Sequence, residues 1–355
     1  MVRERLHYFD MVKGLGIILV VLGHIEYISE ELRGWISSFH MPLFFVVSGM
    51  LICYLGQSNL DMKSIISKRF RGIMIPYISF TIIYTLIDVL NIYLHKITPL
   101  TFAQNIISGV TLYGSSVLWF LPALFLSEIG FILLIKKIPR VPSIIVVLAV
   151  APLAYLGQIA ISDVYTAHES SLVITSLINF VRVFLRAIIA MSFVGVAYYL
   201  FPLLQRQEKV SWKGLTLGIV MTIITLPLSQ INGCVDFRNI IFKNFLLFYL
   251  CALLGSFGLV LICKNIRHVP QICFFGENSL VVMCTHVNCY ILYAAILIAW
   301  QIDTIITRAK SYVFLFNIMI FTFLFEAILI YIINRFFPWI IGKRKEQKVC
   351  QKKND

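Results

Sequence analysis

The first apolar stretch of the chain carries a lysine and a histidine at a spacing that places them on one side of a helix. Lys13 lies near its start and His24 near its end, eleven residues further on. Eleven residues of α-helix make about three turns and rise ~16 Å, so both side chains share one face. A neutral imidazole can remove a proton from a reacting hydroxyl, which makes His24 a candidate general base. The alternative is structural, with His24 hydrogen-bonded to a neighbouring helix and Lys13 marking the helix end.

Other residues of this stretch fit a site as well. Asp10 precedes Lys13 by three residues and lies about 40° off the same line, so an ion pair between the two is available. Three glycines leave the helix surface bare, at Gly14, Gly16 and Gly23. Bare surface permits the close approach of a neighbouring helix or of a ligand.

The composition places this stretch in a membrane. Of the 355 residues, 59% belong to the hydrophobic set and 13% are charged, and the mean hydropathy is +0.89. Runs of about 18 to 25 mostly uncharged residues recur, each long enough to cross a hydrocarbon core of roughly 30 Å as a helix. We expect an all-α polytopic bundle, one transmembrane domain over 1–340, with about ten helices at 11–28, 39–55, 73–94, 117–135, 142–161, 176–200, 213–229, 241–263, 275–299 and 312–334. Ionisable groups at bilayer depth are costly and by default mark a site.

The basic residues predict the orientation of the bundle. The net charge is +13, yet lysines and arginines gather in every second connecting segment, which is the positive-inside pattern and argues against a nucleic-acid partner. Both termini are expected in the cytoplasm, with 341–355 as a basic tail. The eight cysteines contain no C-x-x-C pair, so we expect neither disulfides nor a metal site.

Five landmarks follow one another along the chain. They are the Lys13-x10-His24 spacing, Phe39-His40-Met41-Pro42 continuing to Gly49, Lys68-Arg69-Phe70-Arg71 before Pro76-Tyr77, the run from Leu118 to Leu124, and the segment from Phe275 to His286. Their order and separation resemble the acyltransferase family 3 membrane proteins, and in particular the fucose 4-O-acetylase-like branch. The resemblance spans most of the chain.

The resemblance implies a multi-pass enzyme of the bacterial plasma membrane. Such proteins move an acyl group, usually acetyl, from cytoplasmic coenzyme A to a hydroxyl of a surface glycan or its lipid-linked precursor. Acetyl-CoA is then a donor substrate, and no bound cofactor is expected. The family's catalytic histidine is matched by His24, with Asp10, Lys13 and His40 as supporting residues.

Donor contacts are expected from cations on the cytoplasmic side. Lys13 and the loop residues Lys68, Arg69 and Arg71 suit charge-assisted contacts with the phosphates of coenzyme A. Topology alone also calls for basic residues in this loop. The family's Arg-x-x-Arg pattern is Arg69-x-x-Gly72 here, with the second arginine at Arg71, so which cation meets the donor stays open.

Acceptor contacts are expected from four residues in later helices. Trp119 can stack on a sugar face, although interfacial tryptophan is common in membrane proteins. Arg182 and Arg186 lie one turn apart in an apolar run and can hold an acidic acceptor or a pyrophosphate-linked lipid. The alternative is that both arginines pair with Glu128, Asp88 or Glu326. His286 is a second candidate base, for which we favour a structural or acceptor role.

Other readings of the chain remain open at this stage. Some relatives carry a fused extracytoplasmic domain, so we expect this chain to act alone or with a separate partner, and a homo-oligomer is compatible with the sequence. A polytopic transporter or a flippase of a lipid-linked sugar is the alternative of a different class. An enzyme of the other large membrane acyltransferase group, which modifies lipids or proteins, is a third.

Overall fold

The protein is a bundle of α-helices. The computed structural model describes residues 4–168, 171–205, 210–306 and 312–343. Within these ranges every regular element is helical, and one isolated β-bridge joins Asp236 and Ile241. Eight of the described helical segments are long and apolar enough to cross a membrane. The predicted all-α polytopic bundle is confirmed, whereas most of the tail predicted at 341–355 lies outside the described residues.

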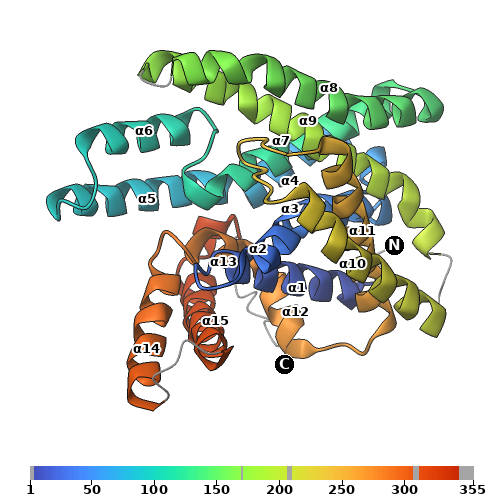
Figure 1. Cartoon of the computed structure of the whole chain (residues 1–355). Coiled ribbons are helices and arrows are strands. Elements are labelled where there is room, and N and C mark those ends of the chain that lie inside the picture. The colour runs from blue at the N-terminus through green and yellow to red at the C-terminus, as the bar shows by residue number, and fades with distance from the viewer. Residues whose placement is uncertain (1–3, 169–170, 206–209, 307–311, 344–355) are drawn as a thin grey trace, which may run out of the picture.

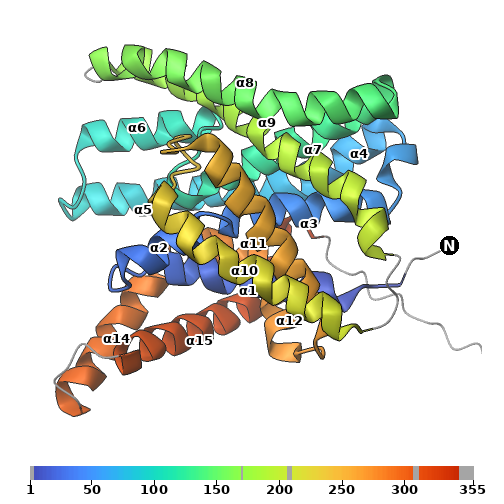
Figure 2. The ribbon, with the colours of Figure 1, turned by 45° about the vertical axis from the view of Figure 1, so that its right-hand side comes forward.

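Helix α1 (His7–Gly23) lies in the middle of the bundle (Figures 1 and 2). It packs against α3 (His40–Tyr54), α11 (Phe245–Asn265) and α12 (Pro270–Glu277). The expected close approach occurs at two of its glycines. A Cβ at Gly14 would collide with the carbonyl oxygen of Ile272 in α12, and one at Gly16 would lie 2.9 Å from Leu43 of α3.

The first helix ends five residues earlier than predicted. Hydropathy extends the apolar run to residue 28, but α1 stops at Gly23 and a separate helix, α2 (Glu30–Ser37), follows. From α2, the guanidinium of Arg33 donates hydrogen bonds to the carbonyl oxygens of Gly23 and Ile25, both at 3.2 Å. Carbonyls at a helix end need partners of this kind. Arg33 therefore closes the end of α1, and His24 becomes the first residue beyond it.

The predicted helix at 275–299 is wrong as a continuous element. The structure divides it into α12, α13 (Ser279–Thr285) and α14 (Ile291–Ile306). Tyr290 has a φ of 58°, which is left-handed backbone that no α-helix contains. The hydroxyl of Tyr84 donates to the carbonyl of Cys284 at 2.5 Å. Tertiary contacts of this kind override the helical tendency of an apolar run.

Antiparallel helix pairs form the outer layer of the bundle (Figures 1 and 2). In these pairs α8 (Arg140–Ala167) packs on α9 (Leu172–Gln205), α10 (Trp212–Asn232) on α11, and α14 on α15 (Tyr312–Phe336). Large apolar side chains such as Leu153 and Leu246 stay exposed on the surface. A surface of this kind is suited to lipid.

A π-helical turn shapes the basic loop after α3. Helix α4 (Met62–Arg69) passes through the turn Phe70–Met74 into α5 (Ile75–Tyr93). Arg69 is half-buried and Arg71 is exposed on this segment. Helix α6 (Pro99–Val110) then folds back on α5, and α7 (Phe120–Lys137) follows a 3-10 turn at Ser116–Trp119. Hydropathy alone predicted neither α4 nor α6.

The glycine contact between α1 and α12 gives a test of this packing. Gly14→Ala sets a methyl group against backbone that cannot yield, so we expect a loss of about 1–3 kcal/mol in stability. The measurement is the thermal melting temperature of the purified protein in detergent. Gly72→Ala is the control, because a Cβ there meets nothing within 4 Å. If Gly14→Ala and wild-type protein had the same melting temperature, the contact would not be native.

Candidate active site

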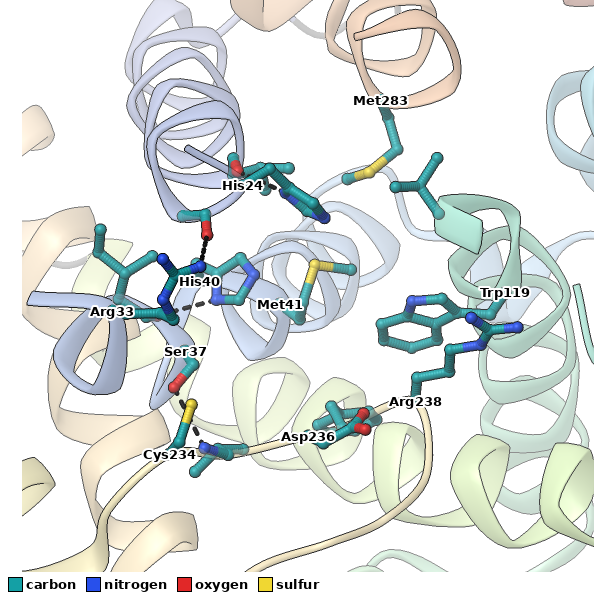
Figure 3. Close-up of a pocket in the computed structure, with 16 residues that line it drawn as sticks. His24, Arg33, Ser37, His40, Met41, Trp119, Cys234, Asp236, Arg238 and Met283 are labelled. Atoms are coloured by element: carbon teal, nitrogen blue, oxygen red, sulfur yellow. Dashed lines mark hydrogen bonds between the residues drawn. The ribbon is translucent and has the colours of Figure 1, made fainter. Parts of the chain in front are cut away.

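A cavity of about 230 Å³ lies beside His24. Its wall combines the end of α1, α2, the start of α3, the turn before α7 and the loop between α10 and α11 (Figure 3). The side chains that border it and carry polar atoms are those of His24, Arg33, Ser37, His40, Trp119, Cys234, Asp236 and Arg238. We call this space the outer cavity.

The His24 ring is held in one tautomer. The last turn of α1 tightens, because the backbone N–H of His24 donates to Val21, three residues back, at 3.1 Å. This leaves the carbonyl of Val20 free, and the Nδ1 of His24 lies 2.8 Å from its oxygen. Nδ1 must therefore carry the proton, and Nε2 keeps its lone pair. His24 is exposed and borders the outer cavity, so the imidazole can act as a base there.

A second histidine supports the first from behind. His286 is fully buried, and its ring meets that of His24 edge to face with centroids 4.9 Å apart. Its Nδ1 donates to the carbonyl of Val282 at 2.7 Å, and its Nε2 lies 3.5 Å from Nδ1 of His24. Because the one Nδ1–H of His24 is donated to Val20, His286 packs against the His24 ring and is not the main acceptor of this proton. His286 does not border the outer cavity in the described structure, so it contacts His24 rather than the space for a ligand.

His40 repeats the local arrangement of His24. It begins α3, borders the outer cavity, and its Nδ1 donates to the carbonyl of Ile36 at 2.8 Å. Its Nε2 is therefore also an acceptor. The structure brings His24 and His40 to the same cavity, as their predicted roles require.

A second cavity, of about 190 Å³, lies at the Lys13 end of the α1 face that Lys13 and His24 share. We call this face the Lys13–His24 stripe. Apolar side chains of α3 and α7 form most of its lining, and its charged and hydroxyl groups come from Lys13, Ser48, Arg69, Glu128 and Ser279. The Nε of Arg69 lies 2.8 Å from Glu128 Oε2, and the Ser48 hydroxyl donates to the other carboxylate oxygen. We call this space the inner cavity.

The predicted ion pair at the start of α1 is confirmed. Lys13 Nζ lies 2.9 Å from Asp10 Oδ1. Arg5 contacts the other Asp10 oxygen at 2.8 Å and also Glu277 at 2.8 Å. Asp10 thereby holds Lys13 at the rim of the inner cavity and ties the start of α1 to the end of α12.

The two cavities meet at one side chain. Among the described residues that line them, Met283 of α13 alone borders both. The two ends of the predicted Lys13–His24 stripe thus open into separate spaces that share this wall. A donor and an acceptor could approach from opposite ends.

The predicted donor residues do not gather in one place. Arg69 lines the inner cavity, but Lys68 is exposed and Arg71 borders a different cavity beside Lys63. A donor role for Lys68 and Arg71 stays a prediction that this geometry does not support directly.

The predicted acceptor residues also separate. Trp119 borders the outer cavity, and the guanidinium of Arg186 lies 5.1 Å from its ring. Arg186 donates to the carbonyls of Arg238 and Tyr113, both at 3.2 Å. Arg182 lies elsewhere, over the ring of Tyr165 at 4.1 Å.

The alternative that these two arginines pair with Glu128, Asp88 or Glu326 is wrong. Glu128 pairs with Arg69, Asp88 accepts from Asn105 at 2.8 Å, and Glu326 accepts from Thr285. Within the described ranges, no ion pair reaches either arginine.

Sequence reasoning missed three charged residues of the outer cavity. From the sequence, no site role was assigned to Arg33, Asp236 or Arg238. Asp236 accepts from the backbone and side chain of Asn239 at 3.0 and 2.6 Å, which shapes the loop. Arg238 donates to the carbonyl of Gly114 at 2.9 Å. One signal in the sequence could have found the two arginines. Both lie in segments that the positive-inside pattern assigns to the external side, where cations are few.

Comparison with known proteins supports one family. A family model described as an acyltransferase domain matches residues 6–340. No curated protein and no solved structure matches the chain. Among the described residues, no three His, Cys, Asp or Glu side chains gather in a group that could hold a metal ion.

The ion pair between half-buried Arg69 and buried Glu128 predicts a double-mutant result. Arg69→Met leaves the Glu128 carboxylate, 2% exposed, without its cation. Breaking one partner of such a pair costs about 3–5 kcal/mol, so the melting temperature in detergent should fall. Adding Glu128→Gln removes the stranded charge and should restore most of the loss. Arg71→Met, at an exposed site, is the control. A double variant no more stable than Arg69→Met would contradict the ion pair.

Proposed function

The chain belongs to the acyltransferase family 3, and on that premise we propose that it moves an acyl group, most simply acetyl, from cytoplasmic acyl-CoA to a hydroxyl of a surface glycan or its lipid-linked precursor. The observation that carries this proposal is the pair of cavities that meet at Met283. One cavity holds a histidine with a free lone pair, and the other holds two cations. This is the arrangement that a reaction between substrates from two sides of a membrane needs.

The donor would enter from the inner cavity. The positive-inside pattern assigns the Lys13 end of α1 to the cytoplasm. Lys13 and Arg69 would contact the phosphates, as cations that are each held by a carboxylate. The apolar lining from Phe44, Leu121 and Leu280 suits the thioester arm and the acyl group. The nucleotide itself would stay outside this space, near exposed Lys68.

The acceptor would occupy the outer cavity. Trp119 stacks on Phe237 with centroids 5.7 Å apart and an interplanar angle of 18°, so its orientation is fixed. Figure 3 shows Trp119 and Arg238 across the cavity from His24 and His40. An indole face suits a sugar ring, and Arg238, which borders the cavity, would favour an acceptor with an acidic or phosphate group.

The chemistry assigns a role to each atom of the His24 ring. Nε2 takes the proton of the acceptor hydroxyl as its oxygen bonds to the thioester carbonyl carbon. The C–S bond then breaks, and the imidazolium returns the proton to the leaving thiolate. The Val20 carbonyl, 2.8 Å from Nδ1, holds the ring and stabilises its positive charge. Such a base contributes about 10²–10⁴-fold to a rate.

The test is the acyl content of the glycan after loss of His24. His24→Gln keeps a side chain of similar polarity but removes the base, so O-acyl groups on the isolated glycan should fall at least ~100-fold. They are measured by mass spectrometry or NMR, with protein levels checked in the membrane. His168→Gln is the matched control, because its Nδ1 also contacts a carbonyl four residues back, at 3.0 Å, away from both cavities.

The same experiment separates the transporter alternative. Unchanged acylation in a stably inserted His24→Gln protein would overturn the proposed mechanism. Unchanged acylation together with impaired export of the glycan would favour a transporter or flippase instead.

A further inference from the structure

We infer that Met283 is the partition between donor and acceptor and that its side chain limits the length of the acyl group that is transferred. The inference rests on the proposed function and names the residue that selects among acyl donors.

Met283 lies where the two cavities meet. It is 4% exposed, and it is the one residue among the described lining that borders both cavities. Figure 3 shows its side chain extending from α13 into the space between His24 and Trp119. On the inner side its neighbours in the lining are Phe44, Phe120 and Leu280. Because Met283 is the described residue that borders both cavities, we expect an acyl group that passes from the inner cavity to His24 to pass beside it.

The backbone around Met283 is fixed, so the side chain is the element that can yield. Tyr84 holds the carbonyl of Cys284 at 2.5 Å, and the hydroxyl of Thr285 donates to Glu326 at 2.8 Å. Both anchors lie within two residues of Met283. Methionine is unbranched and has three rotatable bonds, so it can turn aside for a small acyl group without movement of α13.

The anchored backbone around Met283 limits the size of the acyl group that the inner cavity can hold. The inner cavity is about 190 Å³ and must hold the thioester arm as well as the acyl group. An acetyl group needs little room beyond the carbonyl, whereas a butyryl group adds two methylene groups that meet the Met283 side chain. Where apolar side chains line a pocket, one methylene group changes selectivity by about 10–200-fold. Met283 therefore favours acetyl over longer groups.

The experiment compares donors in the full-length protein in membranes. Acetyl-CoA and butyryl-CoA are supplied separately, and O-acyl transfer to the isolated glycan is measured for each. Met283→Ala removes the side chain beyond Cβ and joins the cavities, so the butyryl-to-acetyl ratio should rise at least ~10-fold. Met41→Ala is the matched control. Met41 borders the outer cavity alone, so its loss should leave the ratio unchanged whatever it does to the rate.

A second variant tests the partition when the first is poorly active. Met283→Trp should reduce acetyl transfer while retaining binding of acetyl-CoA, measured by equilibrium binding to purified protein, because the nucleotide contacts are elsewhere. An unchanged donor ratio in a folded, active Met283→Ala protein would overturn the inference. So would full acetyl transfer by Met283→Trp. Wild-type protein that neither binds acetyl-CoA nor transfers acetyl would instead reject the proposed function, and this inference with it.

Discussion

The hydrogen bond between the His24 ring and the carbonyl of Val20 is the interaction on which the site depends. Helix α1 tightens in its last turn, where the backbone N–H of His24 donates to Val21, so the Val20 carbonyl is left for the ring. Arg33 donates to the carbonyls of Gly23 and Ile25 and so closes the helix end beside this ring. The ring proton is then committed to Nδ1, and the lone pair of Nε2 is presented to the outer cavity. His286, buried against the same ring, limits how far it can turn.

At the opposite end of α1, each cation beside the inner cavity is held in place by an ion pair. Lys13 is held by Asp10, and Arg69 is held by Glu128. Each cation keeps its place beside an apolar space without a ligand, so an anionic donor would meet preorganised groups. These cations border the inner cavity, His24 borders the outer cavity, and Met283 lies between the two cavities. This arrangement suits a reaction in which the polar part of the donor stays on one side of the membrane and its acyl group crosses to the other.

The residues that share one face of α1 could be predicted from the sequence, but several residues that complete the site could not. The spacing of Asp10, Lys13 and His24 was sufficient for their common helix, because helical geometry is local. His40 and Trp119 were found through the family resemblance, and both border the outer cavity. The roles of Arg33 and Arg238 could not be found, since Arg33 acts through the unforeseen break after Gly23 and Arg238 through the carbonyl of distant Gly114. The break in the run at 275–299 was missed for the same reason, because apolar periodicity carries no record of the contact between Tyr84 and Cys284.

The most direct measurement is a structure of the protein with a non-hydrolysable acyl-CoA analogue. We predict phosphates beside Lys13 and Arg69 and the acyl carbonyl next to Met283. A hydroxyl oxygen should have room about 3–3.5 Å from that carbonyl carbon and within reach of His24 Nε2. An analogue whose acyl group lay outside both cavities, or whose phosphates entered from the His24 side, would contradict this prediction.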